Sequence, residues 1–307
     1  MTSVTILLLA VALDLVLGDP PNALHPTAWM GQFIGWCAAR APQRGAAAQF
    51  VYGALLVLFG ILLFILPIHL GLASLRAWNE IAFVVASAVI MKTTFTLRGL
   101  VRAARAVQAA LVAGDLPEAR RRVAWHLVSR DTRALDQVHV VSATIESVAE
   151  NLADSFVAPL FFYALFGVPG ALAYRFVNTA DAMIGYHGKT EYLGKAAARL
   201  DDLLNLVPAR VSGLLIVIGA ICARADARGA WRVLWRDHAR TGSPNAGYPM
   251  SAMAGALGVQ LEKIGHYCLG DATHTLTPTL ISRALWVMGA AAGLWLLGLT
   301  LLLFTVY

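Results

Sequence analysis

Apolar residues are gathered along this chain into long runs separated by polar stretches. Three of these runs are strong and cover residues 50–72, 80–98 and 285–307. An α-helix needs about 20 mostly apolar residues to cross the hydrocarbon core of a bilayer. We therefore predict that each run is a membrane-spanning helix, and that a short link joins the first two runs into a helical hairpin.

Three further apolar runs are weaker. Residues 3–17 are short for a span and are interrupted by Asp14. Residues 156–174 and 206–223 contain prolines and glycines, which interrupt helices. Membrane proteins build sites at depth from broken helices, because the break frees backbone groups to face a cavity. The pattern fits two ordinary spans and two re-entrant segments equally well.

Composition places the whole chain in the membrane class. Of its 307 residues, 58% are hydrophobic and 14% are charged, whereas soluble domains carry about 25% charged residues. We predict an all-α, polytopic integral membrane protein: one membrane domain over residues 1–307, with broken or re-entrant segments and a cytoplasmic helical active-site region. Three scattered cysteines exclude a disulfide scaffold. The basic residues lack interleaved aromatics, so we expect no nucleic-acid partner.

The arginines predict an orientation in the membrane. They concentrate in residues 18–49, 99–155 and 224–284, and the positive-inside rule places these segments in the cytoplasm. The chain is then a multi-pass protein of the cytoplasmic (inner) membrane, with the bilayer as its first partner. Arginines also recur every fourth residue from 224 to 240, which predicts a basic helical stripe facing anionic lipid headgroups.

Three acids lie four residues apart in the stretch IESVAENLADS: Glu146, Glu150 and Asp154. An α-helix stacks residues at this spacing on one face. The carboxylates would repel one another, and desolvation near a membrane adds to the cost. Mg²⁺ would neutralise them because it takes oxygen ligands, and arginines such as Arg130 would serve as well. Asn151 lies beside the acids, and a solvated helix face is the plain alternative.

A second polar group lies between the two weak segments. Asn178 and Asp181 are three residues apart, and Asp201 and Asn205 are four apart, so each pair shares a helix face. Acids and amides suit Mg²⁺, and basic side chains suit phosphate. The candidates are Asn178, Asp181, Lys189, Arg199, Asp202 and Arg210. Simple pairing of Asp202 with Arg199 is the alternative.

Two smaller features complete the candidates. Ser243-Pro244-Asn245 has the composition of a turn, and a helix N-terminus behind a turn is a natural phosphate site. The small residues between 251 and 258 fit close helix packing equally well. His25 lies beside Pro26 at the membrane edge, although a single histidine is more often structural.

Several long signatures resemble the CobD/CbiB family of cobalamin biosynthesis, the adenosylcobinamide-phosphate synthases. They occur in family order from residue 14 to about residue 258. The signatures are DLVLGDPPNALHP, RDTRALD, IESVAENLADSFVAPLFF, YRFVNTADAMIGY, AARLDDLLNLVPAR and GSPNAGYPMSAMAGALGV.

The resemblance implies that the chain makes an amide. Family members join aminopropanol, or its O-phosphate, to a propionate of adenosylcobyric acid, and ATP with Mg²⁺ is expected because the reaction is uphill in water. One carboxylate would remove the amine proton. The implied catalytic residues are Glu150, Asp154 and Asp181, and the implied metal ligands are Glu146, Glu150, Asp154 and Asp202. Substrate and phosphate would be bound by His25, Arg130, Asn151, Asn178, Lys189, Arg199, Arg210, Ser243 and Asn245. A homo-oligomer is compatible with the sequence.

Two other classes of function fit the sequence less well. A magnesium-dependent intramembrane prenyl or phosphoalcohol transferase also uses acids at the membrane face. The stretches NTADAMIGY and ARLDDLLN lack the aspartate repeat that such enzymes show. A membrane sensor or transporter would carry charges within strong spans, whereas most acids here lie beside the weak segments.

Overall fold

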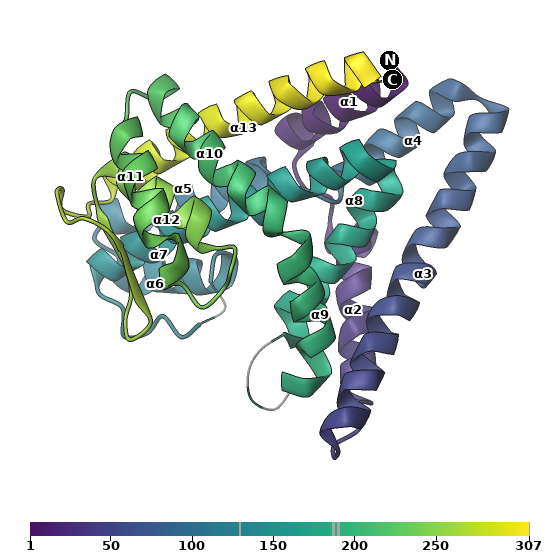
Figure 1. Cartoon of the computed structure of the whole chain (residues 1–307), viewed down its shortest axis with the longest axis horizontal. Helices are drawn as coiled ribbons and strands as arrows, with labels where there is room; N and C mark the ends of the chain where they lie inside the picture. Colours follow the sequence, from purple (N-terminus) through teal and green to yellow (C-terminus); the bar gives the residue numbers. More distant parts are fainter. Residues whose placement is uncertain (129, 186–187, 189–190, 307) are drawn as a thin grey trace. The chain divides into compact units, whose positions relative to one another are not determined.

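The computed structural model is helical over most of the chain and confirms the predicted all-α class (Figure 1). It describes residues 1–307 except 129, 186–187, 189–190 and 307. The chain forms two compact units. Unit 1 comprises residues 1–96, 158–205 and 300–307, and unit 2 comprises residues 97–157 and 206–299.

Most helices of unit 1 pack along the long helix α3. The elements are α1 (Thr2–Leu17), η1 (Asn22–Leu24), α2 (Pro26–Ala38), α3 (Ala46–Trp78), α4 (Glu80–Lys92), α8 (Ala158–Ile184) and α9 (Glu191–Leu204). Two glycines let α3 approach its neighbours closely. A Cβ on Gly53 would lie 1.9 Å from the Leu193 carbonyl oxygen, and one on Gly60 would lie 1.9 Å from the Phe176 ring.

Unit 2 surrounds one short buried helix, α12 (Gly247–Leu257). Its other elements are α5 (Arg98–Val112), α6 (Leu116–His126), α7 (Gln137–Leu152), the π-helical turn η2 (Ala153–Val157), α10 (Leu206–Cys222), α11 (Ala227–Asp237), η3 (His238–Arg240), β1 (Gln260–Lys263), β2 (Tyr267–Gly270) and the part of α13 (Thr279–Val306) up to Leu299. Every residue of α12 is buried. Its small residues permit this, because a Cβ on Gly255 would lie 2.3 Å from the carbonyl oxygen of Gly229 in α11. The run between 251 and 258 therefore serves helix packing.

Three stretches of the described chain are long and apolar enough to cross a membrane. They are Ala46–Trp78, Gln137–Ile184 and Thr279–Thr305. A fourth span results if α9 and α10 count together as one broken helix, and α1 is a shorter apolar helix. The strong run 50–72 thus lies within α3, and the strong run 285–307 lies within α13 as far as residue 306, the last one described. Several apolar helices of this length indicate a membrane protein.

The prediction of a single membrane-spanning helix over residues 80–98 is wrong, because the helix there is too short. Helix α4 ends at Lys92 after 13 residues, which corresponds to about 20 Å against a hydrocarbon core of about 30 Å. The hydroxyls of Thr93 and Thr94 donate to the carbonyls of Ile90 and Met91 and close the last turn. The ammonium of Lys92, the last residue of α4, binds two acids. These are Asp14 of α1 at 2.9 Å and Asp19 in the loop after α1 at 2.5 Å.

The weak run 156–174 is broken, as its glycines and prolines predict. The backbone passes through the π-helical turn η2 into α8, and it leaves the helical conformation at Gly167, whose φ is 65°. A positive φ is accessible to glycine at little cost, and Pro169 lies two residues further on. For this segment and for 206–223, the spanning and the re-entrant interpretation both stay predictions.

Candidate functional site

The first candidate site is built around Glu146 on α7. Asp136 caps this helix by accepting a hydrogen bond from the His139 backbone N–H. Glu146 is 4% exposed, and both of its oxygens are engaged. The Ser142 hydroxyl donates to Oε1 at 2.7 Å, and the Tyr267 phenol donates to Oε2 at 2.9 Å. Glu146 is therefore held in place by hydrogen bonds.

Glu150, one helical turn further along, is in a different situation. Its side chain is half-buried and has no hydrogen-bond or ion-pair partner within the described parts of the chain. Arg130 and Lys263 lie close enough to attract its carboxylate, and Glu146 close enough to repel it. The Arg130 guanidinium also lies 3.7 Å from Glu146. The two glutamates share a face as predicted, but only Glu150 keeps its oxygens available for a ligand.

The β-hairpin that supplies Tyr267 and Lys263 was not predicted from the sequence. These two residues are paired across β1 and β2 next to the turn, where Gly265 has a φ of 76°. The Glu262 backbone N–H donates to the Ser142 hydroxyl at 2.8 Å, which fixes the hairpin on α7. Burial raises the pKa of Tyr267, and the negative charge of Glu146 raises it further. The phenol therefore stays a hydrogen-bond donor at neutral pH.

Asp154 and Asn151 lie where α7 passes into the π-helical turn. The Asn151 amide donates to the Ser147 carbonyl at 3.0 Å, and its oxygen accepts from Ser155 at 2.9 Å. Asn151 thus bonds to its own helix, which competes with the predicted substrate contact. Asp154 is half-buried within η2. A π-helical turn holds more residues than an α-helical turn, so Asp154 leaves the regular spacing of Glu146 and Glu150.

The fit of these acids to a metal ion is poor. Among the described residues, no group of three or more His, Cys, Asp or Glu side chains is arranged to hold a metal. The oxygens of Glu146 are already taken by Ser142 and Tyr267. The residues proposed as ligands therefore do not form a metal site by themselves, and any Mg²⁺ bound there would need ligands from the substrates.

A second candidate site lies within unit 1, between α8 and α9. Asp201 is 9% exposed and accepts hydrogen bonds from the amides of Asn178 at 3.3 Å and Asn205 at 3.0 Å. The carboxylates of Asp181 and Asp202 lie close enough to repel each other. The predicted face-sharing of Asp201 and Asn205 is confirmed. Arg199 lies close enough to Asp202 to attract it.

Two residues near this cluster extend it. Arg175 donates to Asn178 Oδ1 at 3.3 Å, and the Tyr174 hydroxyl donates to Asn205 Oδ1 at 2.9 Å. Neither was a sequence candidate, although both belong to the quoted signature YRFVNTADAMIGY. Lys189, which was a candidate, lies outside the described residues.

His25 has a structural task in unit 1. Its Nδ1 accepts a hydrogen bond from the Thr27 backbone N–H at 3.2 Å and so caps α2, whose first residue is Pro26. Burial lowers the pKa of His25, although Asp19 nearby opposes this shift. The neutral imidazole is the form that accepts the capping bond. The structural reading of this histidine is the one that its contacts support.

Arg210, Ser243 and Asn245 come together in unit 2. The Ser243 hydroxyl accepts from the backbone N–H groups of Asn245 and Ala246, so it caps the turn before α12. The Arg210 guanidinium donates to Asn245 Oδ1 at 3.4 Å and lies 4.3 Å from the centre of the Tyr248 ring. The turn is confirmed, and the phosphate site stays a prediction.

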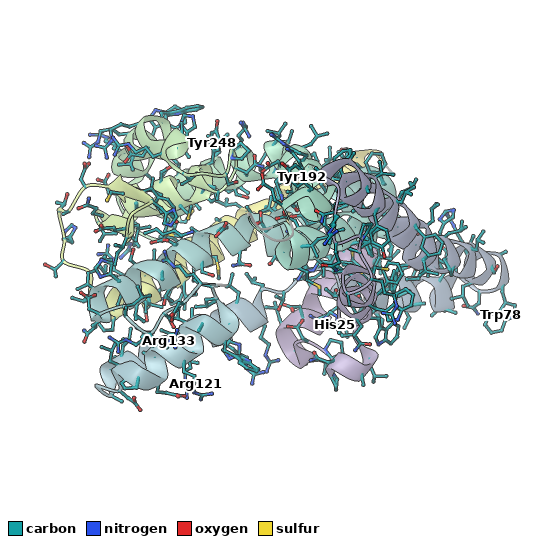
Figure 2. All side chains as sticks on the ribbon, turned by 90° about the horizontal axis from the view of Figure 1, so that it is seen from below. His25, Trp78, Arg121, Arg133, Tyr192 and Tyr248 are labelled. Carbon is teal, nitrogen blue, oxygen red and sulfur yellow. The ribbon has the colours of Figure 1, made fainter. Side chains whose placement is uncertain are left out.

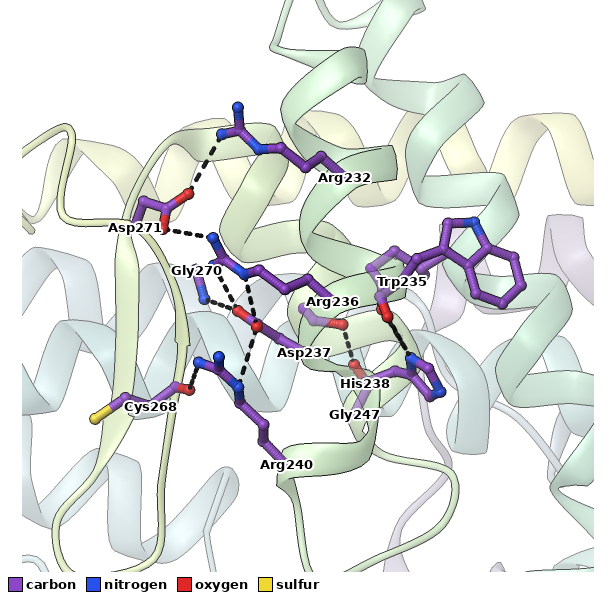
Figure 3. Close-up of polar contacts among 12 residues, drawn as sticks. Arg232, Trp235, Arg236, Asp237, His238, Arg240, Gly247, Cys268, Gly270 and Asp271 are labelled. Carbon is purple, nitrogen blue, oxygen red and sulfur yellow. Dashed lines mark hydrogen bonds and ion pairs between the residues drawn. The ribbon is translucent and has the colours of Figure 1, made fainter.

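Three arginines of the row from 224 to 240 bind acids of their own unit (Figure 3). Arg232 and Arg236 pair with Asp271, at 3.3 and 2.8 Å. Asp237 is fully buried and binds Arg236 at 2.8 Å and Arg240 at 3.1 Å. It also accepts from the Gly270 backbone N–H. Part of the predicted lipid-facing stripe therefore joins α11 to the β-hairpin.

A basic cavity of about 510 Å³ lies on unit 2. Arginines 120, 121, 130 and 133 line it, together with Trp125; Arg121 and Arg133 are labelled in Figure 2. The Trp125 side chain is 79% exposed. Arg121 is paired with Glu118 and Arg133 with Asp131, whereas Arg130 reaches toward Glu146. The cavity thus offers an exposed aromatic ring and a cation, Arg130, that also lies beside Glu146 and Glu150. Arg130, Lys263, Tyr267 and these two glutamates are called the α7 site below.

The comparison with known proteins agrees with these signatures. The family described as CobD/Cbib protein matches residues 7–288. The chain belongs to the CobD/CbiB family. It is 49% identical to the cobalamin biosynthesis protein CobD of Dehalococcoides mccartyi, over 95% of this chain and 94% of that protein. It is 36% identical to the cobalamin biosynthesis protein CobD of Klebsiella pneumoniae, over 92% of each. A probable CobD of Methanothermobacter thermautotrophicus is 41% identical over 88% of each chain. No solved structure gives a significant match.

Proposed function

We propose that this protein is the cobalamin-pathway synthase that joins aminopropanol, or its O-phosphate, to a propionate of adenosylcobyric acid. The family match from residue 7 to residue 288 carries the assignment to cobalamin biosynthesis. The availability of Glu150 supports the reaction type, because a carboxylate beside two cations suits a step that brings an amine to an activated acid.

The chemistry requires that the propionate be activated first. Transfer of a phosphoryl or adenylyl group from ATP to the carboxylate oxygen makes a mixed anhydride. The amine nitrogen then attacks the carboxyl carbon, the C–N bond forms and the anhydride C–O bond breaks. The phosphate-containing group leaves with the bonding electrons, and the nitrogen loses a proton.

Each group of the α7 site has a part in this scheme. Glu150 binds the incoming ammonium and, as a general base, removes one proton to free the nitrogen lone pair before attack. The second proton leaves the nitrogen to solvent once the C–N bond has formed. Arg130 and Lys263 attract the negative charge of the leaving group. Glu146, held by Ser142 and Tyr267, keeps Arg130 in position. These groups belong to unit 2, and the acids of α8 and α9 in unit 1 are kept as a second candidate site.

ATP and Mg²⁺ belong to the proposal as co-substrate and counter-ion. The basic cavity beside Arg130 has the charge that nucleotide phosphates need, and Trp125 offers a ring on which a base can stack. Mg²⁺ would arrive with the nucleotide, since the protein acids do not form a metal site alone. We place the site on the cytoplasmic face of the inner membrane, where both ATP and the corrinoid are found.

The test is direct synthesis by the purified protein in detergent. Adenosylcobyric acid, Mg-ATP and either aminopropanol or its O-phosphate are supplied, and the products are identified by mass spectrometry. We expect an amide with one of the two amines. Recovery of ADP or of AMP then tells which group activates the acid. Absence of an amide from verified substrates and folded protein would sink the proposal.

A further inference from the structure

Unit 1 contains a cavity that the proposed synthase reaction does not use. It has a volume of about 310 Å³ and lies between α1, α3, α4 and the kink of α8. Apolar side chains, among them Leu72 and Phe83, form part of its wall, and Ser87, His69 and Arg76 form the polar part. A mixed lining of this kind suits a ligand with one apolar and one polar end.

Ser87 gives the first sign that a ligand is missing. Its side chain is fully buried, and its hydroxyl has no hydrogen-bond partner among the residues that the structure describes. A buried hydroxyl without a partner costs about 1–3 kcal/mol, and native proteins rarely leave one so. Since Ser87 lines the cavity, a ligand oxygen placed there would accept its hydrogen bond.

Arg76 gives the second sign. No carboxylate in the described chain forms an ion pair with its guanidinium, which lies 5.5 Å from the centre of the Phe83 ring. The acid on the neighbouring α4 is Glu80, which already accepts a hydrogen bond from Thr2 at 3.0 Å. Arg76 is thus a cation in the wall of the cavity that can bind the anionic group of a ligand.

The position of Arg76 along α3 indicates the kind of anion. It lies two residues before the end of the helix, next to Trp78, which is 79% exposed. Tryptophan at a helix end marks the level of lipid headgroups, where an arginine can reach a phosphate. Ser87 lies seven residues into α4, about 10 Å along that helix, which is the direction of the acyl chains.

The surface near the cavity is apolar, as contact with lipid requires. Phe166 at the α8 kink and Leu70 on α3 are 65% and 56% exposed. Only 22% of the most apolar window of α3 is buried within the protein. An acyl chain can therefore lie against these side chains while its headgroup enters the cavity.

We propose that this cavity is a specific site for an anionic phospholipid, whose phosphate binds Arg76 and whose glycerol ester accepts a hydrogen bond from Ser87. The site is independent of the synthase chemistry and holds unit 1 at a defined depth in the membrane. Zwitterionic lipids fit less well, because the residues described as lining the cavity include a cation and no carboxylate for a choline group.

The experiment measures lipid binding to the purified full-length protein in detergent. Phosphatidylglycerol and phosphatidylcholine are titrated, and native mass spectrometry counts the bound lipids while a thermal scan follows Tm. We expect one phosphatidylglycerol to bind preferentially and to raise Tm. The variant Arg76→Gln should bind it about tenfold more weakly, because it loses one charged hydrogen-bonding contact.

Two matched variants make the test sharper. Ser87→Ala should fold as stably as the wild type without lipid, since its hydroxyl has no protein partner, but should bind phosphatidylglycerol more weakly. Arg44→Gln, which removes an exposed loop cation, should bind as the wild type does. Equal binding by wild type and Arg76→Gln would overturn the proposal. So would an equal rise in Tm with sn-glycerol 3-phosphate, which would indicate a site for soluble phosphate.

Discussion

The phenol of Tyr267 donates a hydrogen bond of 2.9 Å to Glu146 Oε2, although the two residues are 121 positions apart in the chain. The bond fixes the β-hairpin over α7, and it engages one carboxylate oxygen of Glu146. It therefore separates the two neighbouring glutamates into one that is held and one, Glu150, that is available. The proposed reaction depends on this difference.

Replacing Tyr267 by Phe should weaken unit 2 and the activity together. Loss of the donor leaves a buried carboxylate oxygen partly unsatisfied, at a cost of about 1–3 kcal/mol. We expect a lower Tm in detergent and slower synthesis. Tyr192→Phe is the control, because Tyr192 is 44% exposed. An unchanged Tm for Tyr267→Phe would mean that this bond does not support the hairpin.

Replacing Glu150 by Gln should affect the reaction and leave folding intact. We expect kcat to fall by about 100-fold or more, the usual effect of losing a general base, with Tm unchanged or raised because a half-buried charge is removed. Glu262→Gln on β1 is the matched control, since its carboxylate is 44% exposed. Wild-type kcat in Glu150→Gln would contradict the assigned role.

Local sequence predicted the features that local chemistry controls. Pro169 and Gly167 interrupt the helical pattern by themselves, so the break in α8 could be foreseen. The shared face of Glu146 and Glu150 also follows from spacing alone. These predictions need only the chain within a few residues.

Contacts between distant residues decided the rest. Hydropathy over residues 80–98 could not reveal that α4 ends at Lys92, whose ammonium binds Asp14 and Asp19. The arginine spacing predicted a stripe, but its partner Asp271 lies more than 30 positions away along the chain. The strands of the hairpin have four residues each, too few to give a clear alternating pattern.

Replacing Gly255 by Ala tests the packing role of the small residues in α12. The new Cβ would meet the Gly229 backbone, which cannot move aside easily, so we expect a loss of about 1–3 kcal/mol of stability. Gly289→Ala in α13 is the control, because a Cβ there meets nothing within 4 Å. That variant should unfold at or above the wild-type temperature. Equal Tm values for both variants would contradict close packing at Gly255.

Replacing Asp237 by Asn should destabilise unit 2 more than the same change at Asp271. Asp237 is fully buried and binds two arginines, whereas the Asp271 side chain is 41% exposed. Removing one partner of a buried ion pair costs about 3 kcal/mol or more, and an exposed pair is worth about 1 kcal/mol or less. Thermal unfolding in detergent measures both. A larger loss of Tm for Asp271→Asn than for Asp237→Asn would contradict the view that the buried acid contributes more to stability.

Lowering the pH should remove the stabilisation that the Asp237 carboxylate contributes to the fold, over a defined range of pH. Burial alone would raise the pKa of this carboxyl, but the hydrogen bonds from Arg236 and the Gly270 N–H outweigh burial and lower it. A folded pKa below the ordinary value of 3.8 means that the unfolded chain binds the proton more readily. The stabilisation is therefore fully present above pH 3.8 and is lost as the pH falls through the folded pKa. We expect the gap in Tm between wild type and Asp237→Asn to close in that range. A gap that stays constant down to pH 2.5 would show that the buried charge does not supply the stability.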